Sequence, residues 1–518
     1  MPSARQWTLV ATIIGSSLTF IDATVVNVAL PALQADLHAT ITDLQWVIEA
    51  YALSLGSLIL VGGSMGDQLG RRRIFLAGVL LFTLASMACG LATSTRALIV
   101  ARAIQGAGAA FLVPGSLAII SATFDDAERG RAIGTWSGFS AITSAIGPVV
   151  GGWLIEHVSW RAIFFLNVPL AAVVVVLSLR YMRESRDDTR SRRVDWTGAV
   201  LAVLGLGGLV FGLLEWPRPE ASRSTVLGAI GAGVAALGAF LAVERRAPGP
   251  MLPLGLFRSR TFTLANVLTL FLYGSLGTVL WLVPLNLIQV QHYSATAAGA
   301  AFLPLPILMF VLSRWSGGLV AHVGSRLPLT LGPIVAAVGL ALYARPGIGG
   351  SYWTTFFPAV AVLGLGMSLV VAPLTTTAMT AVETEHAGVA SGVNNAIARA
   401  AGLIAIAVFG IALVRVFNSR VSPALDQLRL PAAARVAVDR ELPKLAGAQI
   451  DTPMEPAQRA GTQRVIDEAF VSAFRLVMIG ASALALAAAA AGGLIREQPR
   501  SFASGQRATA RPTETTPQ

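Results

Sequence analysis

Apolar stretches long enough to cross a lipid bilayer recur fourteen times along this chain, and they constrain its fold more than any other feature. A transmembrane helix needs about 20 consecutive, mostly apolar residues. Such a stretch must be helical, because an open sheet leaves backbone groups without partners in lipid. We therefore predict an all-α polytopic membrane protein with 14 transmembrane helices. The predicted spans cover residues 8–33, 44–66, 74–94, 97–122, 133–155, 161–180, 197–215, 224–243, 262–285, 297–321, 327–345, 352–376, 389–416 and 469–495.

Composition supports this class and excludes others. Of the 518 residues, 54% are hydrophobic and 13% are charged, whereas soluble domains carry about 25% charged residues. Cys89 is the only cysteine, so no disulfide forms within the chain and no thiolate cluster binds a metal. The phosphate-binding pattern G-x-x-x-x-G-K-[ST] does not occur, so ATP is not the predicted energy source. The sequence shows neither a serine nucleophile motif nor histidines at metal-ligand spacing, and we do not expect an enzyme.

Arginines predict the orientation in the membrane. They gather in alternate short loops and form no basic domain, so the net charge of +11 does not indicate a nucleic-acid partner. The basic loops carry Arg71, Arg72, Arg73, Arg129, Arg131, Arg180, Arg183, Arg186, Arg190, Arg192, Arg193, Arg245, Arg246, Arg258 and Arg260. The intervening short loops carry few arginines, such as Arg96, Arg218, Arg223 and Arg345. The positive-inside rule then places both termini in the cytoplasm.

Glycines recur at fixed offsets between the two halves of the chain. Gly63, Gly70 and Gly78 are matched by Gly317, Gly324 and Gly332 at an offset of 254, and Gly106, Gly108, Gly130 and Gly134 by Gly364, Gly366, Gly388 and Gly392 at an offset of 258. Such a repeat predicts two bundles related by an axis along the membrane normal. We expect an N-terminal six-helix bundle over 1–194, two extra linker helices over 195–260, and a C-terminal six-helix bundle over 261–496.

The long loop 418–468 is predicted to lie outside. It combines five prolines with short amphipathic stretches. Two interpretations remain open: a solvated connector, or a cap over the outer vestibule or docking surface for a partner. The tail 497–518 is rich in Pro, Thr, Ser and Arg, so we expect it to be disordered and cytoplasmic.

A short polar segment, GSMGDQLGRRR from Gly63 to Arg73, separates two apolar runs. Burying its charge in lipid would cost several kcal/mol, so we predict a tight loop at the membrane surface. The pattern G-x-x-x-D-x-x-G-R-R resembles the loop between the second and third helices of major facilitator transporters.

Three spans carry further motifs. The first reads IDATVVNVALP from Ile21 to Pro31, the fourth contains Arg102, Gln105, Gly106 and Gly108, and the fifth contains Gly134, Gly147, Pro148, Gly151 and Gly152. Together with the 63–73 segment, they resemble the motifs of the major facilitator drug:proton antiporters. With fourteen spans, the chain is similar to the EmrB/QacA branch of that family, and the resemblance covers nearly its whole length.

Proton coupling is the role predicted for Asp22, Glu49 and Arg102. Asp22 lies about mid-span, where a carboxylate is costly unless it is paired, hydrated or protonated; the alternative is a helix-packing hydrogen bond with Thr24 or Asn27. Glu49 is expected in an outer vestibule, or else at a wetted helix end. The resemblance implies that Arg102 takes part in proton coupling with Gln105 close by, and the alternative is an arginine reaching the interface.

The resemblance also implies two structural motifs. Asp67 would pair with an arginine across the two bundles, in a conformational latch of Gly63, Asp67, Gly70, Arg71 and Arg72. The antiporter motif of Gly134, Gly147, Pro148, Gly151 and Gly152 would let span five bend and pack closely, which prevents leak.

Polar residues in other spans are candidates for a substrate cavity. Asn395 and Arg399 share a face of span thirteen, where they would line the cavity or bind an acidic partner; structural hydrogen bonding is the alternative. The expected cavity residues are Asn27, Gln105, Asn394, Asn395 and Arg399.

These observations predict a proton-coupled antiporter in the bacterial cytoplasmic (inner) membrane. It would export lipophilic drugs, cationic ones favoured, by alternating access, with the proton gradient as energy source and no cofactor. An exporter of an endogenous metabolite or lipid is the alternative. The expected partners are small-molecule substrates, protons and the lipid bilayer; a monomer is expected, and a periplasmic adaptor protein is left open.

Overall fold

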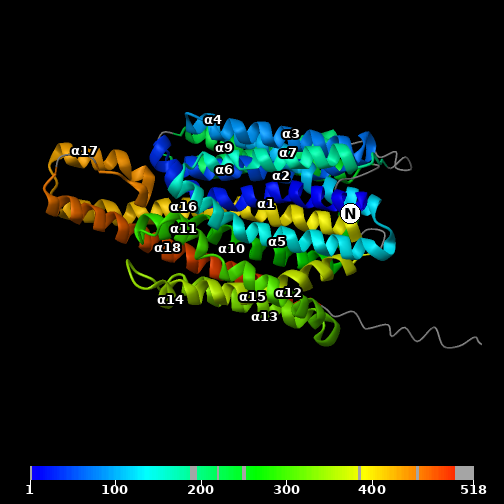
Figure 1. Cartoon of the computed structure of the whole chain (residues 1–518). Helices are drawn as coiled ribbons and strands as arrows, with labels where there is room; N and C mark the ends of the chain where they lie inside the picture. The colour runs from blue at the N-terminus through cyan, green and yellow to red at the C-terminus, as the bar shows by residue number, and fades with distance from the viewer. Residues whose placement is uncertain are drawn as a thin grey trace, which may run out of the picture.

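The computed structural model of the chain is a bundle of long helices that run roughly parallel to one another (Figure 1). It describes residues 3–186, 195–218, 221–247, 252–382, 387–450 and 454–495, among which no β-strand occurs. The all-α prediction is therefore confirmed. The predicted tail 497–518 lies outside the described residues.

Three groups of helices follow one another along the chain. The N-terminal half comprises α1 (Ala4–Leu37), α2 (Ile41–Leu69), α3 (Arg71–Gly90), α4 (Thr95–Thr123), α5 (Asp126–His157), α6 (Ala162–Phe165) and α7 (Asn167–Tyr181). The extra pair is α8 (Trp196–Glu215) and α9 (Arg223–Glu244). The C-terminal half comprises η1 (Leu254–Arg258), α10 (Arg260–Leu285), η2 (Asn286–Val290), α11 (Ala295–Ala300), α12 (Pro304–Val323), α13 (Arg326–Leu342), α14 (Tyr352–Thr355), α15 (Phe357–Thr380), α16 (Ala387–Gln427), α17 (Ala432–Glu441), η4 (Leu442–Gly447) and α18 (Pro456–Gly493).

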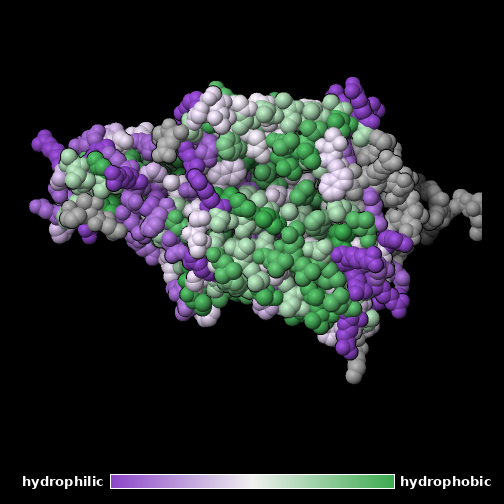
Figure 2. Space-filling view, turned by 90° about the horizontal axis from the view of Figure 1, so that it is seen from above, coloured by the Kyte–Doolittle hydropathy of each residue, from purple (hydrophilic) through white to green (hydrophobic). Residues whose placement is uncertain are grey.

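Twelve helices in the described ranges are long and apolar enough to cross a membrane. The two other predicted spans coincide with α2, which has 29 residues, and with the shorter apolar helix α13, which has 17. Figure 2 shows the expected apolar band between hydrophilic ends. The chain is therefore a multi-pass membrane protein, and the count of fourteen spans stays a prediction.

Two predicted loop boundaries are wrong. The segment 63–73 is not a loop, because α2 remains helical to Leu69 and α3 begins at Arg71. Gly70 makes the whole turn with a φ of 110°, a value that favours glycine because other residues have a Cβ. The single long loop 418–468 is also mostly helical, since α16 extends to Gln427 and α18 begins at Pro456.

Glycine contacts repeat between the two halves. A Cβ on Gly108 would meet the backbone of Phe82, and one on Gly366 would meet the backbone of Ala336. Phe82 and Ala336 are 254 residues apart, which is the offset of the first glycine set. The turn at Gly70 likewise has its counterpart at Gly324, where φ is 77°. These equivalent packings agree with the predicted repeat, while the domain boundaries at 194 and 260 remain predictions.

The extra pair, α8 and α9, packs internally through Gly208, whose added Cβ would lie 3.0 Å from the Cα of Gly233. Its helix α8 contacts both α2 and α16. Trp46 donates to Glu215 at 3.1 Å, and Arg218 bridges Glu215 and Asp43 at 3.1 Å and 2.5 Å. The extra pair therefore covers one interface between the two halves.

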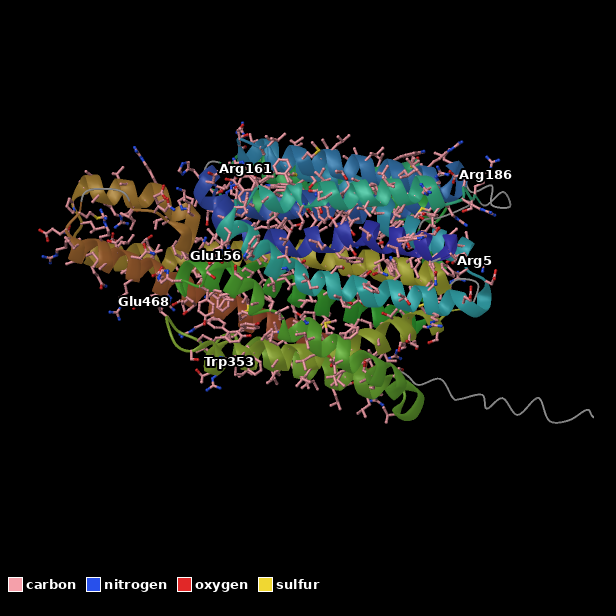
Figure 3. The ribbon with its side chains drawn as sticks, in the orientation of Figure 1. Arg5, Glu156, Arg161, Arg186, Trp353 and Glu468 are labelled. Atoms are coloured by element: carbon pink, nitrogen blue, oxygen red, sulfur yellow. The ribbon has the colours of Figure 1, made fainter. Side chains whose placement is uncertain are left out.

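Helix α17 lies at one end of the bundle, and the N-terminus lies toward the other (Figure 1). We call these the α17 end and the N-terminal end. Arg161, Glu156, Trp353 and Glu468 mark the first, and Arg5 and Arg186 mark the second (Figure 3).

The two halves are hydrogen-bonded to each other at the α17 end. Gln289 of η2 donates to Gln34 of α1 at 2.6 Å, and Gln34 donates to the carbonyl of Lys444 in η4 at 3.1 Å. Thr296 of α11 donates to Glu156 of α5. Because η4 lies where the halves meet, the cap interpretation of the 418–468 segment fits this geometry better than a purely solvated connector; its role stays a prediction.

Candidate functional site: a buried ion pair beside a cavity between the halves

A buried ion pair among the described membrane-spanning helices joins α1 to α4. Arg102 donates to Asp22 Oδ2 at 2.5 Å, and Gln105 Nε2 donates to Asp22 Oδ1 at 2.8 Å. Arg102 also donates to Gln105 Oε1 at 2.7 Å, which closes a triangle of three side chains. The exposed fractions are 1% for Asp22, 2% for Arg102 and 0% for Gln105. Such a charge-assisted pair is strong because its partners are removed from competing water.

Helix α2 completes the surroundings of the ion pair. Arg102 Nε donates to the backbone carbonyl of Val47 at 3.1 Å, and the guanidinium carbon lies 4.1 Å from the centre of the Tyr51 ring. Tyr51 approaches this closely because Gly106 has no Cβ, which would collide with the Tyr51 carbonyl. The arginine is thereby satisfied by a carboxylate, an amide, a carbonyl and an aromatic face.

The structure decides between the alternatives for these residues. The interfacial interpretation of Arg102 is wrong, because the side chain is buried and paired. Asp22 does not use the predicted packing partners: Thr24 and Asn27 donate to carbonyls of their own helix. Gln105, predicted to line the cavity, belongs to the ion-pair triangle instead.

Glu49 does not lie in a wet vestibule, so that prediction is wrong for this conformation. Its exposed fraction is 0%, and both carboxyl oxygens lack a hydrogen-bond partner among the described residues. On the same face of α2, Gln45 donates to the carbonyl of Ile406 at 3.0 Å and Gly56 contacts Arg399. By helical spacing Glu49 therefore faces α16, at the interface between the two halves.

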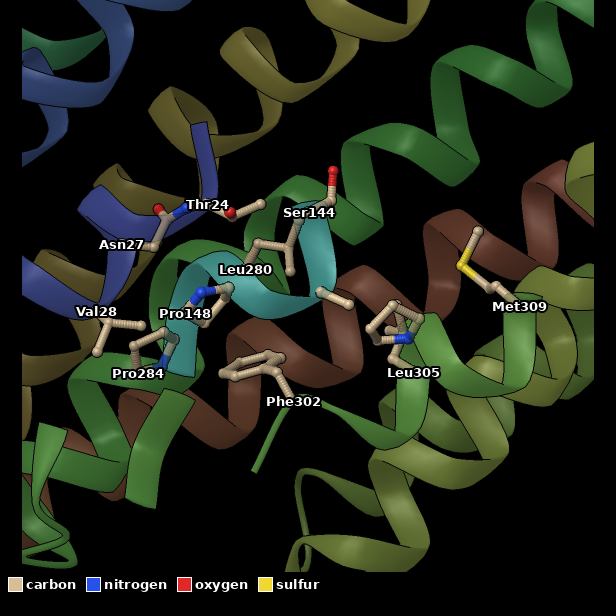
Figure 4. A pocket seen from close by; sticks show the side chains of 12 residues that line it. Thr24, Asn27, Val28, Ser144, Pro148, Leu280, Pro284, Phe302, Leu305 and Met309 are labelled. Atoms are coloured by element: carbon tan, nitrogen blue, oxygen red, sulfur yellow. The ribbon is translucent and has the colours of Figure 1, made fainter. Parts of the chain in front are cut away.

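A cavity of about 270 Å³ lies between the two halves. One wall belongs to the N-terminal half, and we call it the N-terminal wall; it consists of Thr24, Asn27 and Val28 of α1 and Ser144, Ala145 and Pro148 of α5. The opposite wall belongs to the C-terminal half and consists of Leu280, Pro284, Phe302, Leu305, Pro306 and Met309. Figure 4 shows side chains from both walls around the same space. Asn27 lines the cavity as predicted. None of the described lining residues is charged.

The antiporter motif packs α5 against α1. A Cβ on Gly147 would lie 2.5 Å from Thr24 Oγ1, and a Cβ on Gly151 would overlap the Val25 side chain. Gly134, in contrast, has open space around the position of a Cβ. Of these three glycines, only Gly147 and Gly151 are needed for helix packing here.

The same motif also packs α5 against the C-terminal half. A Cβ on Gly152 would meet the carbonyl of Ala295, and a Cβ on Gly299 would meet the carbonyl of Pro148. Both glycines therefore permit backbone contact between α5 and α11. The motif closes the interface between the halves near the α17 end, as the leak-preventing role requires; that role remains a prediction.

Span thirteen, now α16, does not place its polar residues together in the cavity. Asn394 is buried and donates to Asn266 at 3.1 Å and to Thr269 at 2.6 Å, both on α10. Asn394 therefore makes structural hydrogen bonds, which was the alternative to lining the cavity. Asn395 is exposed, and Arg399 is half-buried beside Gly56 of α2. None of the three is among the lining residues of the cavity.

The predicted latch is described only in part, because the side chain of Asp67 lies outside the described residues. Gly63 lies inside helix α2. A Cβ on Gly63 would lie 3.6 Å from the side chain of Pro114, an ordinary van der Waals distance. Gly70 makes the turn, and Arg71 N–H donates to the carbonyl of Ser185 at 2.9 Å.

The remaining latch residue, Arg72, is held by the segment that follows α7. Its backbone N–H donates to Glu184 Oε1 at 3.0 Å, and its guanidinium donates to the carbonyl of Met182 at 3.1 Å. Arg73 lies 3.8 Å from the same carboxylate. These contacts anchor the arginine run within the N-terminal half.

Sequence reasoning missed several residues of this region. Tyr51 belongs to none of the motifs above, although its spacing from Glu49 and Val47 places it within a turn of both. Ser144, Phe302 and Met309 line the cavity without belonging to any motif. Glu184 holds the arginine run, and an acidic residue soon after the end of a predicted span was its only signal.

Two helical halves with equivalent internal packing, a cavity between them and an ion pair buried beside it are typical of a membrane transporter. The family comparison is specific: the model of the Major Facilitator Superfamily matches residues 12–406. The chain belongs to this superfamily, a class of membrane transporters rather than enzymes, whose substrates are small molecules.

Relatives match over nearly the whole chain. The multidrug resistance protein Stp of Mycobacterium tuberculosis is 33% identical over 489 residues, which cover 93% of this chain and 90% of that protein. The tetracenomycin C resistance and export protein of Streptomyces glaucescens is 33% identical over 494 residues, covering 94% and 91%. Among solved structures, a bacterial homologue of the human lysosomal transporter Spinster, inward-facing and unoccupied, has a TM-score of 0.64 at 17% identity, covering 96% of this chain and 100% of that one.

Proposed function

We propose that this protein is a proton-coupled antiporter that exports lipophilic drugs across the bacterial cytoplasmic membrane by alternating access. The observation that carries the proposal is the ion pair of Asp22 and Arg102, buried between membrane-spanning helices beside a cavity that both halves line. The names of relatives for multidrug resistance and for tetracenomycin C resistance and export support the direction and the substrate class.

Helix α1 links the two parts of the proposed mechanism. Asp22 points to α4, while Thr24 and Asn27 of the same helix line the cavity. Protonation of Asp22 would neutralise one partner of the ion pair and remove most of the attraction that holds α1 against α4. A substrate in the cavity would press on the same helix from its other side. Substrate and proton would therefore influence each other through the position of α1.

Alternating access requires the halves to separate at one end while they close at the other. At the α17 end they are held by Gln34, Gln289 and η4 and by the glycine contacts of α5 with α11. In the proposed orientation this end faces outward and the N-terminal end faces the cytoplasm. The proton gradient supplies the energy, with no cofactor, and the monomer is the proposed transporting unit.

The predicted preference for cationic drugs would require a carboxylate in the cavity wall. The described lining residues supply none, so cationic character is not part of this proposal.

The test uses purified protein in proteoliposomes that contain a pH-sensitive dye. Addition of a transported drug is expected to drive proton movement with the wild type, and Asp22→Asn is expected to reduce this movement by about 10²-fold or more, the usual contribution of a proton-transferring group. Asparagine keeps the size of the side chain and one acceptor oxygen for Arg102. The matched control is Asp36→Asn on the same helix, where the carboxylate is half-exposed and paired with Arg161. Undiminished drug-driven proton movement by Asp22→Asn would refute the proposed coupling.

A further inference from the structure

The chemistry of the cavity wall narrows the substrate class, and this inference rests on the function proposed above. The lining has three side chains with polar groups, Thr24, Asn27 and Ser144, and all three are on the N-terminal wall. The opposite wall is apolar, and Phe302 and Met309 face the polar group across the space (Figure 4). A ligand that fills this cavity therefore meets a polar surface on one side only.

The polar wall offers hydrogen-bond acceptors, because its donors are already used. Thr24 Oγ1 donates to the carbonyls of Phe20 and Ile21, at 3.1 Å and 3.0 Å. Ser144 Oγ donates to the carbonyl of Ser140 at 2.9 Å. Each hydroxyl has one proton, so both present only lone pairs to the cavity.

The side-chain amide of Asn27 also has one of its two donors in use. One of its amide protons is donated to the carbonyl of Ala23 at 3.0 Å. Its carbonyl oxygen Oδ1 remains an acceptor, and one N–H remains as the single unused side-chain donor of this wall.

Two prolines leave helix carbonyls of lining residues without their usual i→i−4 donor. Proline has no N–H, so Pro148 cannot bond the carbonyl of Ser144, and Pro284 cannot bond the carbonyl of Leu280. All four residues line the cavity. Among the side chains of the lining residues, acceptors therefore outnumber unused donors.

The lack of a counter-charge excludes cationic ligands. The nearest acidic residue on α1, Asp22, has an exposed fraction of 1% and is bonded to Arg102 and Gln105. A cation that entered this cavity would lose its hydration without gaining a counter-charge from the described lining residues, which costs several kcal/mol. A neutral ligand with a hydrogen-bond donor loses much less hydration free energy.

We infer that the cavity binds neutral lipophilic molecules that present hydroxyl, phenol or N–H donors to the α1–α5 wall and an apolar face to Phe302 and Met309. The volume of about 270 Å³ is slightly below the range of drug sites, about 300–1,000 Å³. Rigid molecules of three or four fused rings match this size.

The test compares three probes for binding to the full-length purified protein. Estrone is a neutral four-ring phenol, its 3-methyl ether lacks the phenolic donor but is more lipophilic, and tetraphenylphosphonium is a lipophilic cation without a donor. Binding of tritiated estrone and its displacement by the other two give the three affinities. We expect the ether and the phosphonium each to bind about tenfold more weakly than estrone or worse, which is the loss of one buried hydrogen bond. Equal or tighter binding of either probe, or no binding of estrone, would overturn the inference.

Variants assign the donor preference to the wall. Thr24→Val and Ser144→Ala each remove an acceptor with little change of volume, and each is expected to narrow the difference between estrone and its ether by several-fold. The matched control is Thr83→Val, because Thr83 likewise donates to a carbonyl of its own helix, that of Val79 at 2.7 Å, but lies on α3 away from the cavity. A full estrone preference in both wall variants and also in Asn27→Leu, which removes the third acceptor side chain, would place the donor site elsewhere and overturn the assignment.

The proton-flux measurement separates this inference from the proposed function. Proton movement driven by tetraphenylphosphonium and absent in Asp22→Asn, without estrone binding, would leave the antiporter proposal standing and refute the donor site. Estrone binding with the expected wall dependence, but without proton movement for any probe, would refute the antiporter proposal and keep the site.

Discussion

Two carboxyl groups are buried in the N-terminal half, on neighbouring helices, and their surroundings are opposite. Asp22 of α1 has a guanidinium and an amide within hydrogen-bond distance. Glu49 of α2 has no hydrogen-bond partner for either oxygen among the residues that the structure describes. The exposed fractions are 1% and 0%, so water does not account for the difference.

This difference shows that burial alone does not determine what an intramembrane acid does. The charge of Asp22 is compensated by Arg102 in this conformation. An ionised Glu49 would be uncompensated, and burying an unpaired charge is far more costly than burying a neutral carboxyl. The present packing therefore accommodates Glu49 in its protonated form. Since Glu49 faces α16 of the other half, separation of the two halves would change the surroundings of Glu49 more than those of Asp22.

Removal of Arg102 should have the largest effect on stability. Arg102→Met would leave the Asp22 carboxylate buried without its charged partner, a change that typically costs about 3–5 kcal/mol. The free energy of unfolding, measured by chemical denaturation in mixed micelles, is expected to fall by that amount. A second substitution, Asp22→Asn in the same chain, should recover part of the loss because it removes the uncompensated charge.

The control for this variant is Arg161→Met. Arg161 also pairs with an aspartate of α1, Asp36 at 2.7 Å, but both side chains are about one-third to one-half exposed, at 34% and 47%. Exposed pairs contribute about 1 kcal/mol or less. Similar losses in Arg102→Met and Arg161→Met would show that burial does not distinguish the two pairs.

A second variant disturbs the surroundings of Asp22 without changing any charge. A Cβ at Gly106 would collide with the carbonyl of Tyr51 and lie 3.0 Å from its Cα. The backbone of α2 must shift, so Gly106→Ala should cost about 1–3 kcal/mol of stability. In the control Gly138→Ala the new Cβ meets nothing within 4 Å, and stability is expected to stay equal or rise, because alanine favours helix. A Gly106→Ala variant as stable as the control would contradict the packing described here.

The sequence predicted the all-α fold and the positions of the long apolar helices, because a membrane accepts few structures and apolar length is a direct signal. Its errors occurred at helix ends. Polar residues such as those between Gly63 and Leu69 can continue a helix beyond the membrane surface, and charge alone does not reveal where the helix stops. The helices around α17 were missed for the same reason, since amphipathic segments outside lipid lack the length signal.

The site was predicted less completely. Asp22, Arg102 and Gln105 could each be selected from the sequence, but their mutual contact depends on how α1 and α4 cross, which glycine spacing does not determine. Asn394 and Glu49 show the converse: a polar residue in an apolar helix is conspicuous, yet its partner, or the lack of one, is set by the neighbouring helix. The cavity wall was hardest to find, because apolar residues such as Phe302 are indistinguishable from lipid-facing ones in the sequence.

The smallest expected effect, and the one of opposite sign, comes from Glu49. Glu49→Leu replaces an unsatisfied polar group by a shorter, branched apolar side chain, so the free energy of unfolding should rise by about 1 kcal/mol. The control is Gln45→Leu, one helical turn earlier on the same face, where the lost side chain donates to the carbonyl of Ile406 at 3.0 Å. That variant should lose about 1 kcal/mol instead, because a buried carbonyl is left without its partner. If Glu49→Leu were destabilising by the several kcal/mol expected for Arg102→Met, Glu49 would have a compensating partner in solution, and the contrast between the two carboxyl groups would not hold. With the contrast confirmed, proton-flux measurements on Glu49→Leu would show whether the unpaired carboxyl contributes to coupling beyond what Asp22 supplies.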